Sequence, residues 1–187
     1  MKKLFANIEK MTCGFKPGYT IYCRAYKHVI EQEIALANIQ EGDVVLNIGC
    51  GSLPFTSIHI AQMTNAKVIG IDRDVEAVKN AKEITKKFGV DDRVQIIHGD
   101  GEEDLGMDFE VAIVALQAGA KERIYKRLME QGGEGCRVVF RQPREKFESV
   151  YGSLPDSLIP TSKAVHPMKA FKESFLFRGV EKKEGSA

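Results

Sequence analysis

The sequence predicts an α/β fold: a doubly wound, mostly parallel sheet of six or seven strands. Short β-branched apolar runs alternate with segments of helical periodicity along the chain. The first run, 44–48, leads directly into a glycine-rich turn, and the second run leads into Asp72. Strands that are buried on both faces and joined by helices form parallel sheets.

The first elements follow each other in strand–helix order. Residues 44–48 form the first strand because the run is apolar, β-branched and uninterrupted. A helix begins near Thr56, and 66–71 forms the second strand. The helix over 74–88 carries apolar residues at helical spacing and ends at Gly89.

The alternation continues through the middle of the chain. The third strand, 93–98, runs into an acidic glycine turn at 99–101. A fourth strand covers 109–115, a helix follows from about 120 to 130, and a fifth strand covers 135–141. Right-handed crossovers between such strands bring all their carboxyl ends to one rim of the sheet.

Three regions divide the chain. Residues 1–40 form a helical, aromatic segment, 41–180 form the ligand-binding domain, and 181–187 form a charged, small-residue tail. Within the domain, prolines make the stretch from 142 to 167 irregular, and 172–178 reads as a final strand that adds to the sheet.

The turn after the first strand predicts an adenosine-containing ligand. Its glycines, Gly49 and Gly51, let the backbone turn tightly and approach a ligand closely. The following helix directs its free amide groups into the same crevice. Asp72 ends the second strand, where a carboxylate accepts hydrogen bonds from ribose hydroxyls.

The loop favours S-adenosylmethionine (SAM) over NAD. A dinucleotide fingerprint has a third glycine beside the pyrophosphate, but this loop continues with Ser52, Leu53 and Pro54. Pro54 supplies no amide donor. SAM carries no phosphate and needs only a close turn and a ribose acceptor. NAD, and a glycine turn without any ligand, stay open as alternatives.

We expect the cofactor contacts to lie on the carboxyl rim. Asp100 is placed there to meet an adenine amino group, and Cys50 is counted as a neighbour of the ligand without a chemical role. Helix capping or turn formation is the alternative role of Asp72 and Asp100. The predicted contacts are Asn47, Gly49, Cys50, Gly51, Pro54, Asp72, Arg73, Asp100, Gly101, Ala115, Leu116 and Gln117.

Composition favours one domain with a small-molecule partner. The 187 residues, 43% of them hydrophobic, suffice for one sizeable core and are too few for two. A net charge of +1 gives no long-range attraction to nucleic acid or membrane. Without a membrane-length apolar run or the apolar core of a signal peptide, we expect a cytoplasmic protein.

The spacing of the cysteines and histidines does not match that of metal ligands, so we expect reduced thiols and no metal site. The residues concerned are Cys13, Cys23, Cys50, Cys136, His28, His59, His98 and His166.

The core is similar to the class I SAM-dependent methyltransferases, whose first strand often reads Val-Leu-Asp-Ile-Gly-Cys-Gly. Here Asn47 stands in place of the acid. More narrowly, the chain resembles the nicotianamine synthase family over roughly residues 20 to 178. Four stretches carry this resemblance: 49–56, with its Gly-x-Gly-x-Leu-Pro-x-Thr, then 115–122, 137–141 and 148–152.

The resemblance implies a Rossmann-like enzyme that transfers the aminocarboxypropyl group of SAM to an amine or amino acid, building a metal-chelating metabolite. An amine acceptor needs a base that holds its nitrogen neutral. Tyr22, Tyr26 and Glu33 fall at the spacing of the family's aromatic segment and are the candidates, with Arg141 as partner for a substrate carboxylate. Their alternative roles are helix packing for the tyrosines and a solvated position for Glu33.

The chain also departs from that family. Nicotianamine synthases carry a helical N-terminal domain that shapes the reaction chamber, and only about forty residues precede the first strand here. Cys23 and Ala25 replace an expected tyrosine and asparagine. We therefore expect part of the acceptor site to be missing or to come from elsewhere, as in a homodimer or a complex with a partner subunit. Methyl transfer, and a non-catalytic SAM-binding subunit or sensor, stay open.

Overall fold

The computed structural model describes residues 17–179, with side chains from residue 26 onward. These residues form seven strands, five α-helices and one 3₁₀ turn. In chain order they are α2 (Pro17–Ala37), β1 (Val44–Ile48), α3 (Phe55–Thr64), β2 (Lys67–Asp72), α4 (Val75–Lys87), β3 (Val94–His98), β4 (Val111–Val114), α5 (Lys121–Gln131), β5 (Arg137–Pro143), η1 (Glu145–Phe147), α6 (Glu148–Tyr151), β6 (Ser162–Val165) and β7 (Phe171–Arg178).

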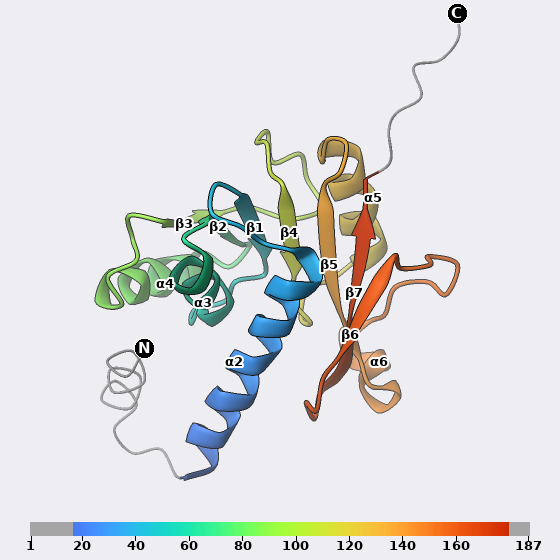
Figure 1. The fold of residues 1–187 in the computed structure, drawn as a ribbon, viewed down its shortest axis with the longest axis horizontal. Coiled ribbons are helices and arrows are strands. Elements are labelled where there is room, and N and C mark those ends of the chain that lie inside the picture. Colours follow the sequence, from blue (N-terminus) through green and yellow to red (C-terminus); the bar gives the residue numbers. More distant parts are fainter. Residues whose placement is uncertain (1–16, 180–187) are drawn as a thin grey trace, which may run out of the picture.

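The strands form one twisted sheet in the order β3-β2-β1-β4-β5-β7-β6 (Figure 1). Strands β1 to β5 pair in parallel, whereas β7 runs antiparallel to both β5 and β6. The expected doubly wound, mostly parallel sheet is therefore confirmed, with seven strands. The order reverses between β1 and β4, and such a reversal leaves a crevice at the carboxyl ends of the strands.

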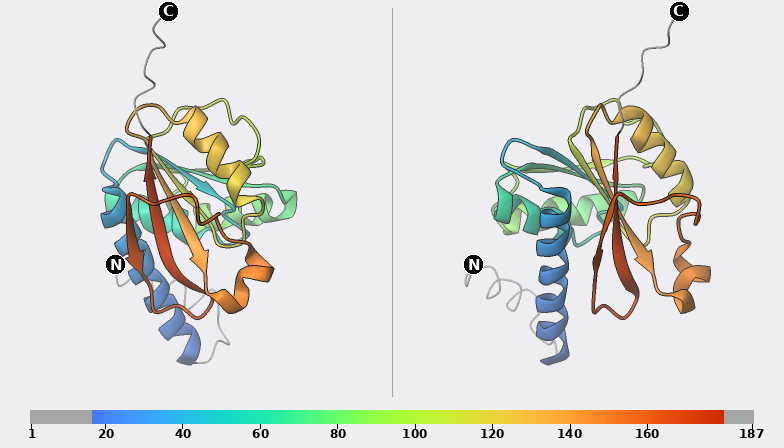
Figure 2. Two further views of the ribbon diagram at one scale, coloured as in Figure 1. Left: turned by 90° about the vertical axis from the view of Figure 1, so that its right-hand side faces the viewer. Right: turned by 45° about the vertical axis from the view of Figure 1, so that its right-hand side comes forward.

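Helices cover both faces of the sheet. Figure 2 shows α2 and α5 on opposite sides of it. On one side, Ile30 of α2 and Ile58 of α3 belong to one apolar cluster with sheet residues such as Val45. On the other side, Leu128 of α5 packs in a second cluster with Phe140. Each strand thus needs apolar residues on both faces, which explains the uninterrupted apolar runs in the sequence.

Helix α2 is fastened to the sheet at its C-terminal end. The Arg137 guanidinium donates to the main-chain oxygens of Ala37 and Asn38, at 3.0 and 2.7 Å, and to Asp43 Oδ1 at 2.8 Å. Carbonyls in the last turn of a helix lack partners within the helix, so this arginine satisfies them. Because Arg137 is the first residue of β5, the C-terminal end of α2 lies beside the start of that strand.

The C-terminal region differs from the sequence prediction in two places. The predicted irregular stretch contains β6, and β5 continues through Gln142 to Pro143. All four residues of β6 are at least partly exposed, so the strand lacks the apolar alternation that would identify it. Pro143 occupies the end of β5 at a shift in register, a position where a strand tolerates proline.

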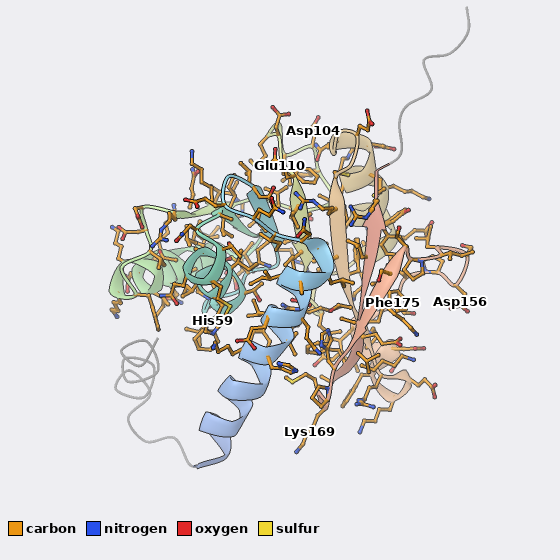
Figure 3. All side chains as sticks on the ribbon, viewed as in Figure 1. His59, Asp104, Glu110, Asp156, Lys169 and Phe175 are labelled. Carbon is orange, nitrogen blue, oxygen red and sulfur yellow. The ribbon has the colours of Figure 1, made fainter. Side chains whose placement is uncertain are left out.

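His59 is a buried residue of α3 (Figure 3), and among the described residues its Nδ1 has no hydrogen-bond partner. Burial lowers the pKa of this imidazole to about 4. The neutral form is therefore favoured in the folded protein, whereas the unfolded chain takes up a proton near pH 6.5.

We predict that acid destabilises the protein through His59. Its contribution is complete above pH 6.5 and is lost as the pH falls toward 4, by about 3 kcal/mol in the free energy of unfolding. Urea unfolding at several pH values measures this effect. The His59→Leu variant should show a shallower pH dependence, while the exposed control His28→Gln should keep the full one. Equal slopes for His59→Leu and the wild type contradict the prediction.

Candidate active site

A cavity of about 370 Å³ lies at the carboxyl ends of the parallel strands. It occupies the place where the order of the strands reverses, which is where ligands bind in sheets of this kind. Most of the predicted cofactor residues line it. They are Asn47, Gly49, Cys50, Gly51, Asp72, Arg73, Asp100, Gly101, Ala115 and Gln117.

Two of the predicted cofactor residues do not line the cavity. Pro54 immediately precedes α3, and the side chain of Leu116 is buried in a separate apolar cluster with Val29, Met168 and Phe171. Direct contact with the cofactor stays a prediction for the residues that do line the cavity.

The glycine turn brings main chain and carboxylate together at the cavity wall. Gly51 has a φ of +67°, a conformation that favours glycine. Its N–H donates to Asp72 Oδ2 at 2.7 Å, and Asp72 Oδ1 accepts from the N–H of Asp74 at 3.1 Å. At Gly101 a Cβ atom would meet Ile48 Cγ2 at 2.5 Å. The turn thus places main chain and a carboxylate side by side at the cavity wall, and Gly101 packs against Ile48 where no side chain would fit.

Cys50 and Asn47 have structural surroundings within this wall. Burial raises the pKa of the Cys50 thiol to about 12, with the charge of Asp72 as a second cause, so the thiol stays neutral. The Asn47 amide donates to the Ile113 carbonyl at 3.3 Å and accepts from Ser57 Oγ at 2.9 Å. Asn47 thus joins β1 to β4 and α3 at the cavity wall.

Three polar side chains from three elements meet at the other end of the cavity. Tyr26 of α2, Thr56 of α3 and Arg141 of β5 all line it. Tyr26 Oη and Thr56 Oγ1 are 3.0 Å apart, and Arg141 donates to both oxygens, at 2.6 and 3.1 Å. We call this trio the acceptor cluster; it lies apart from Asp72, because β1 and β4 separate β2 from β5 in the sheet.

Glu33 binds the acceptor cluster through Arg141, from a position outside the cavity lining. Its carboxylate is fully buried, lies outside the cavity lining, and accepts from Arg141 Nε and Nη2 at 2.8 and 2.7 Å. Burial alone would raise its pKa, but the charge and hydrogen bonds of Arg141 outweigh burial and lower it. The alternative of a solvated Glu33 is therefore wrong. Tyr22 lies in α2, with its side chain outside the described residues.

The hydrogen bonds of Arg141 limit what it can offer a substrate. A guanidinium has five N–H groups, and Glu33, Tyr26 and Thr56 together take four of them. One N–H on Nη1 stays available. Arg141 can therefore make a single hydrogen bond to a substrate carboxylate, but not the paired bonds of an open arginine.

Two residues that support the site were not assigned a role from the sequence. Thr56 lies within the quoted loop motif, but its bond to Tyr26 joins residues 30 positions apart. Lys121 is 3% exposed and donates to the main-chain oxygens of Leu116 and Gly152, among others, at 2.8 and 3.1 Å. Because its partners are carbonyls, no residue type in the sequence signals this role.

Residues 17–179 contain neither a cluster of His, Cys, Asp or Glu able to hold a metal ion nor a helix long and apolar enough to cross a membrane. Cys13 and Cys23 lie outside the residues whose side chains are described.

Residues 39–173 match a family model described as a methyltransferase domain. The chain belongs to this family. This family consists of SAM-dependent transferases, and SAM is the cofactor that the family uses. The glycine turn, Asp72 and the cavity supply a place that fits this cofactor.

Curated relatives match shorter stretches. An L-histidine 2-aminobutanoyltransferase of Yersinia pestis is 33% identical over 76 residues, which cover 41% of this chain and 29% of that protein. A sterol 24-C-methyltransferase of Saccharomyces cerevisiae is 36% identical over 74 residues, covering 40% of this chain and 18% of that protein. The match thus spans less than a third of the length of either relative.

Solved structures match almost the whole chain. The nicotianamine synthase MtNAS, in complex with MTA and tNA, has a TM-score of 0.76 and 21% identity, covering 97% of this chain and 71% of that one. An RNA methyltransferase from Salinibacter ruber has a TM-score of 0.66 and 23% identity, covering 86% and 95%. At such identities the likeness shows the shared Rossmann-like fold of the class I SAM-dependent methyltransferases.

We predict that Asp72→Ala weakens SAM binding by about 1.5–3 kcal/mol, because ribose hydroxyls lose a charged acceptor. Calorimetry measures the change, with Asp156→Ala, an exposed loop residue (Figure 3), as the control of unchanged affinity. Unchanged affinity in a folded Asp72→Ala protein would place the ribose elsewhere.

The same calorimetry tests the choice of cofactor. The wild-type protein should bind SAM and show little binding of NAD, because Pro54 replaces an amide donor in the loop. A preference for NAD contradicts the assignment of the cavity.

Proposed function

We propose that this protein transfers the aminocarboxypropyl group of SAM to the nitrogen of a small amine or amino acid. The observation that carries the proposal is the acceptor cluster. Tyr26, Thr56 and Arg141 place two hydroxyl groups and one free N–H at the end of the cavity opposite Asp72. A hydroxyl pair suits an amine that must be oriented and deprotonated.

Two of the comparisons support transfer of the aminocarboxypropyl group rather than the methyl group. MtNAS, with its likeness over almost the whole chain, was solved with MTA, and methylthioadenosine is the nucleoside that remains after aminocarboxypropyl transfer. The Yersinia pestis relative is named for transfer of a 2-aminobutanoyl group to L-histidine, an amino acid. The name of the relative thus concerns transfer of a four-carbon amino-acid unit, and MTA is the nucleoside that such a transfer leaves behind. Neither concerns a methyl group.

The reaction requires the protein to hold the cofactor, to position the acceptor nitrogen in line with the carbon–sulfur bond, and to take up a proton. Asp72 and the glycine turn hold the adenosine, so that the sulfonium lies between the two ends of the cavity. The acceptor nitrogen attacks the γ-carbon, the carbon–sulfur bond breaks, and its electron pair neutralises the sulfonium. In-line positioning of these partners supplies much of the acceleration.

Tyr26 takes the proton that the nitrogen loses. As the new bond forms, the proton passes to Tyr26 Oη, the Tyr26 hydroxyl proton passes to Thr56 Oγ1 at 3.0 Å, and Thr56 releases its own proton to water in the cavity. The free N–H of Arg141 donates to a carboxylate oxygen of SAM or of the acceptor. Glu33 is ionised and bonded to Arg141, so it acts through that arginine.

Methyl transfer is the second candidate, and the family match favours it. In methyl transfer the acceptor faces the methyl carbon of the same sulfonium. The two reactions therefore differ in the product nucleoside rather than in the residues that surround the cavity.

We predict that turnover of SAM with an amine acceptor releases methylthioadenosine. Incubation of the pure protein with SAM and a panel of amines and amino acids, followed by mass spectrometry of the nucleoside, measures this directly. If S-adenosylhomocysteine accumulates instead, the protein is a methyltransferase. SAM binding without either product makes it a SAM-binding subunit or sensor.

Replacement of Tyr26 by phenylalanine should slow turnover by about 10²- to 10⁴-fold, the usual contribution of a group that transfers a proton. The affinity for SAM should stay the same, because Asp72 and the glycine turn are untouched. The matched control is Tyr125→Phe, at a residue of α5 that packs against the second apolar cluster. If both variants turn over at the wild-type rate, Tyr26 is not the base.

A further inference from the structure

The acceptor cluster continues into the protein as a chain of buried hydrogen bonds. Behind Arg141, the Glu33 carboxylate also accepts from Ser174 Oγ at 2.6 Å. His166 Nε2 lies 2.9 Å from Ser174 Oγ, and His166 Nδ1 lies 2.8 Å from Gln32 Oε1. Glu33 and Gln32 belong to α2, Ser174 to β7, and His166 directly follows β6.

The members of this chain are almost inaccessible to solvent. Glu33 and Ser174 are fully buried, and His166 is 2% exposed. A buried polar group that lacks a partner destabilises the folded state, so each of these residues depends on its neighbours. The region lies outside the cavity, and the proton transfer described above does not use His166 or Ser174.

Counting protons fixes the direction of these bonds. An ionised Glu33 only accepts, so the single proton of Ser174 points at Glu33. Ser174 must then accept from His166, and Nε2 of the imidazole carries a proton. Burial lowers the pKa of His166, which favours the neutral ring. In the neutral ring Nδ1 is an acceptor, so a hydrogen bond to Gln32 then requires the amide to exchange the positions of its oxygen, 2.8 Å from Nδ1, and its nitrogen.

The Glu33 carboxylate cannot rotate while these bonds are in place. Arg141 binds one position on each carboxylate oxygen, and Ser174 binds a second position on Oε1. This arrangement fixes the plane of the carboxylate. The plane of the Arg141 guanidinium follows, because the two groups pair through parallel hydrogen bonds. The positions of the Tyr26 and Thr56 hydroxyls follow in turn, since Arg141 donates to both.

We propose that His166 and Ser174 are positioning residues for the acceptor cluster. Through Glu33 and Arg141 they hold the two hydroxyl groups of Tyr26 and Thr56 at the cavity. Their effect on turnover rests on the proposed function, whereas their effect on Arg141 is a property of the structure alone. The alternative is that His166 and Ser174 only stabilise the packing of β7 against α2.

Nuclear magnetic resonance of the full chain, labelled with ¹⁵N, tests the positioning directly. The solvent exchange of the Arg141 Nε–H is measured, and the signal is assigned by its loss in Arg141→Lys. We expect exchange to be faster by about tenfold or more in Ser174→Ala, because Glu33 loses a buried hydrogen bond, and in His166→Phe, because Ser174 loses the partner that directs its proton to Glu33. His166→Gln, which keeps a donor near the position of Nε2, and the exposed control Ser157→Ala should keep the wild-type rate.

The amide of Leu46 in β1 serves as the internal reference, because its exchange reports unfolding of the sheet. Faster exchange at Arg141 with unchanged exchange at Leu46 supports positioning. An unchanged Arg141 rate in Ser174→Ala, or equal acceleration at both sites, overturns the proposal. Neither result depends on which group the protein transfers.

Steady-state kinetics of the same variants provide a second test of the proposal. We expect kcat to fall by about 10- to 100-fold in Ser174→Ala and His166→Phe, the scale of a small misplacement of reacting groups. The KM for SAM should change less than about twofold because the adenosine end is untouched. His166→Gln should recover most of the kcat. A loss that only matches the fraction of unfolded protein contradicts positioning, whereas absence of turnover in the wild type contradicts the proposed function.

Discussion

The ion pair between Glu33 and Arg141 joins α2 to the sheet at the place where the cavity ends. Both side chains are buried, and the charge of Glu33 raises the pKa of the guanidinium although burial opposes this. Removing one member of such a pair leaves a buried charge without a partner, which costs about 3–5 kcal/mol. The pair therefore ties the stability of the fold to the geometry of the acceptor cluster. An apolar replacement would fill the space but could not orient Tyr26.

The parallel sheet sets the other constraint. Because β1 to β4 run in the same direction, the turns that follow them gather at one rim, and Asp72 and Asp100 face one cavity. The N–H of Gly51 already donates to Asp72, so the turn itself orients this carboxylate. The glycine-turn end of the cavity thus depends on main-chain geometry, whereas the acceptor cluster depends on side chains from α2, α3 and β5.

The residues at the glycine-turn end of the cavity could be predicted as neighbours because their signals are local. The apolar run of β1, the glycine turn and Asp72 lie within 30 residues of each other, and each has a direct physical meaning. The acceptor end combines residues far apart in the chain. Glu33 and Arg141 are separated by 108 positions, and no pattern in either segment indicates that they pair.

Other features escaped prediction for related reasons. Ser174 and His166 reach Glu33 only because β7 runs antiparallel beside β5, and β6 carries no periodic signal. The side chain of Leu116 lies outside the cavity lining because it packs with Phe171, which comes from the far end of the sequence. The residue types indicated that the carboxyl rim of the sheet binds a ligand. Which side chains face this rim depends on the tertiary fold.

A crystal structure with SAM bound distinguishes aminocarboxypropyl transfer from methyl transfer, because it shows which carbon of the sulfonium faces the acceptor cluster. We expect the γ-carbon on the Tyr26 side of the sulfur, with the methyl group directed away from Tyr26 and the ribose hydroxyls on Asp72. A methyl group that points at Tyr26 Oη, with the γ-carbon shielded by the wall, would contradict aminocarboxypropyl transfer.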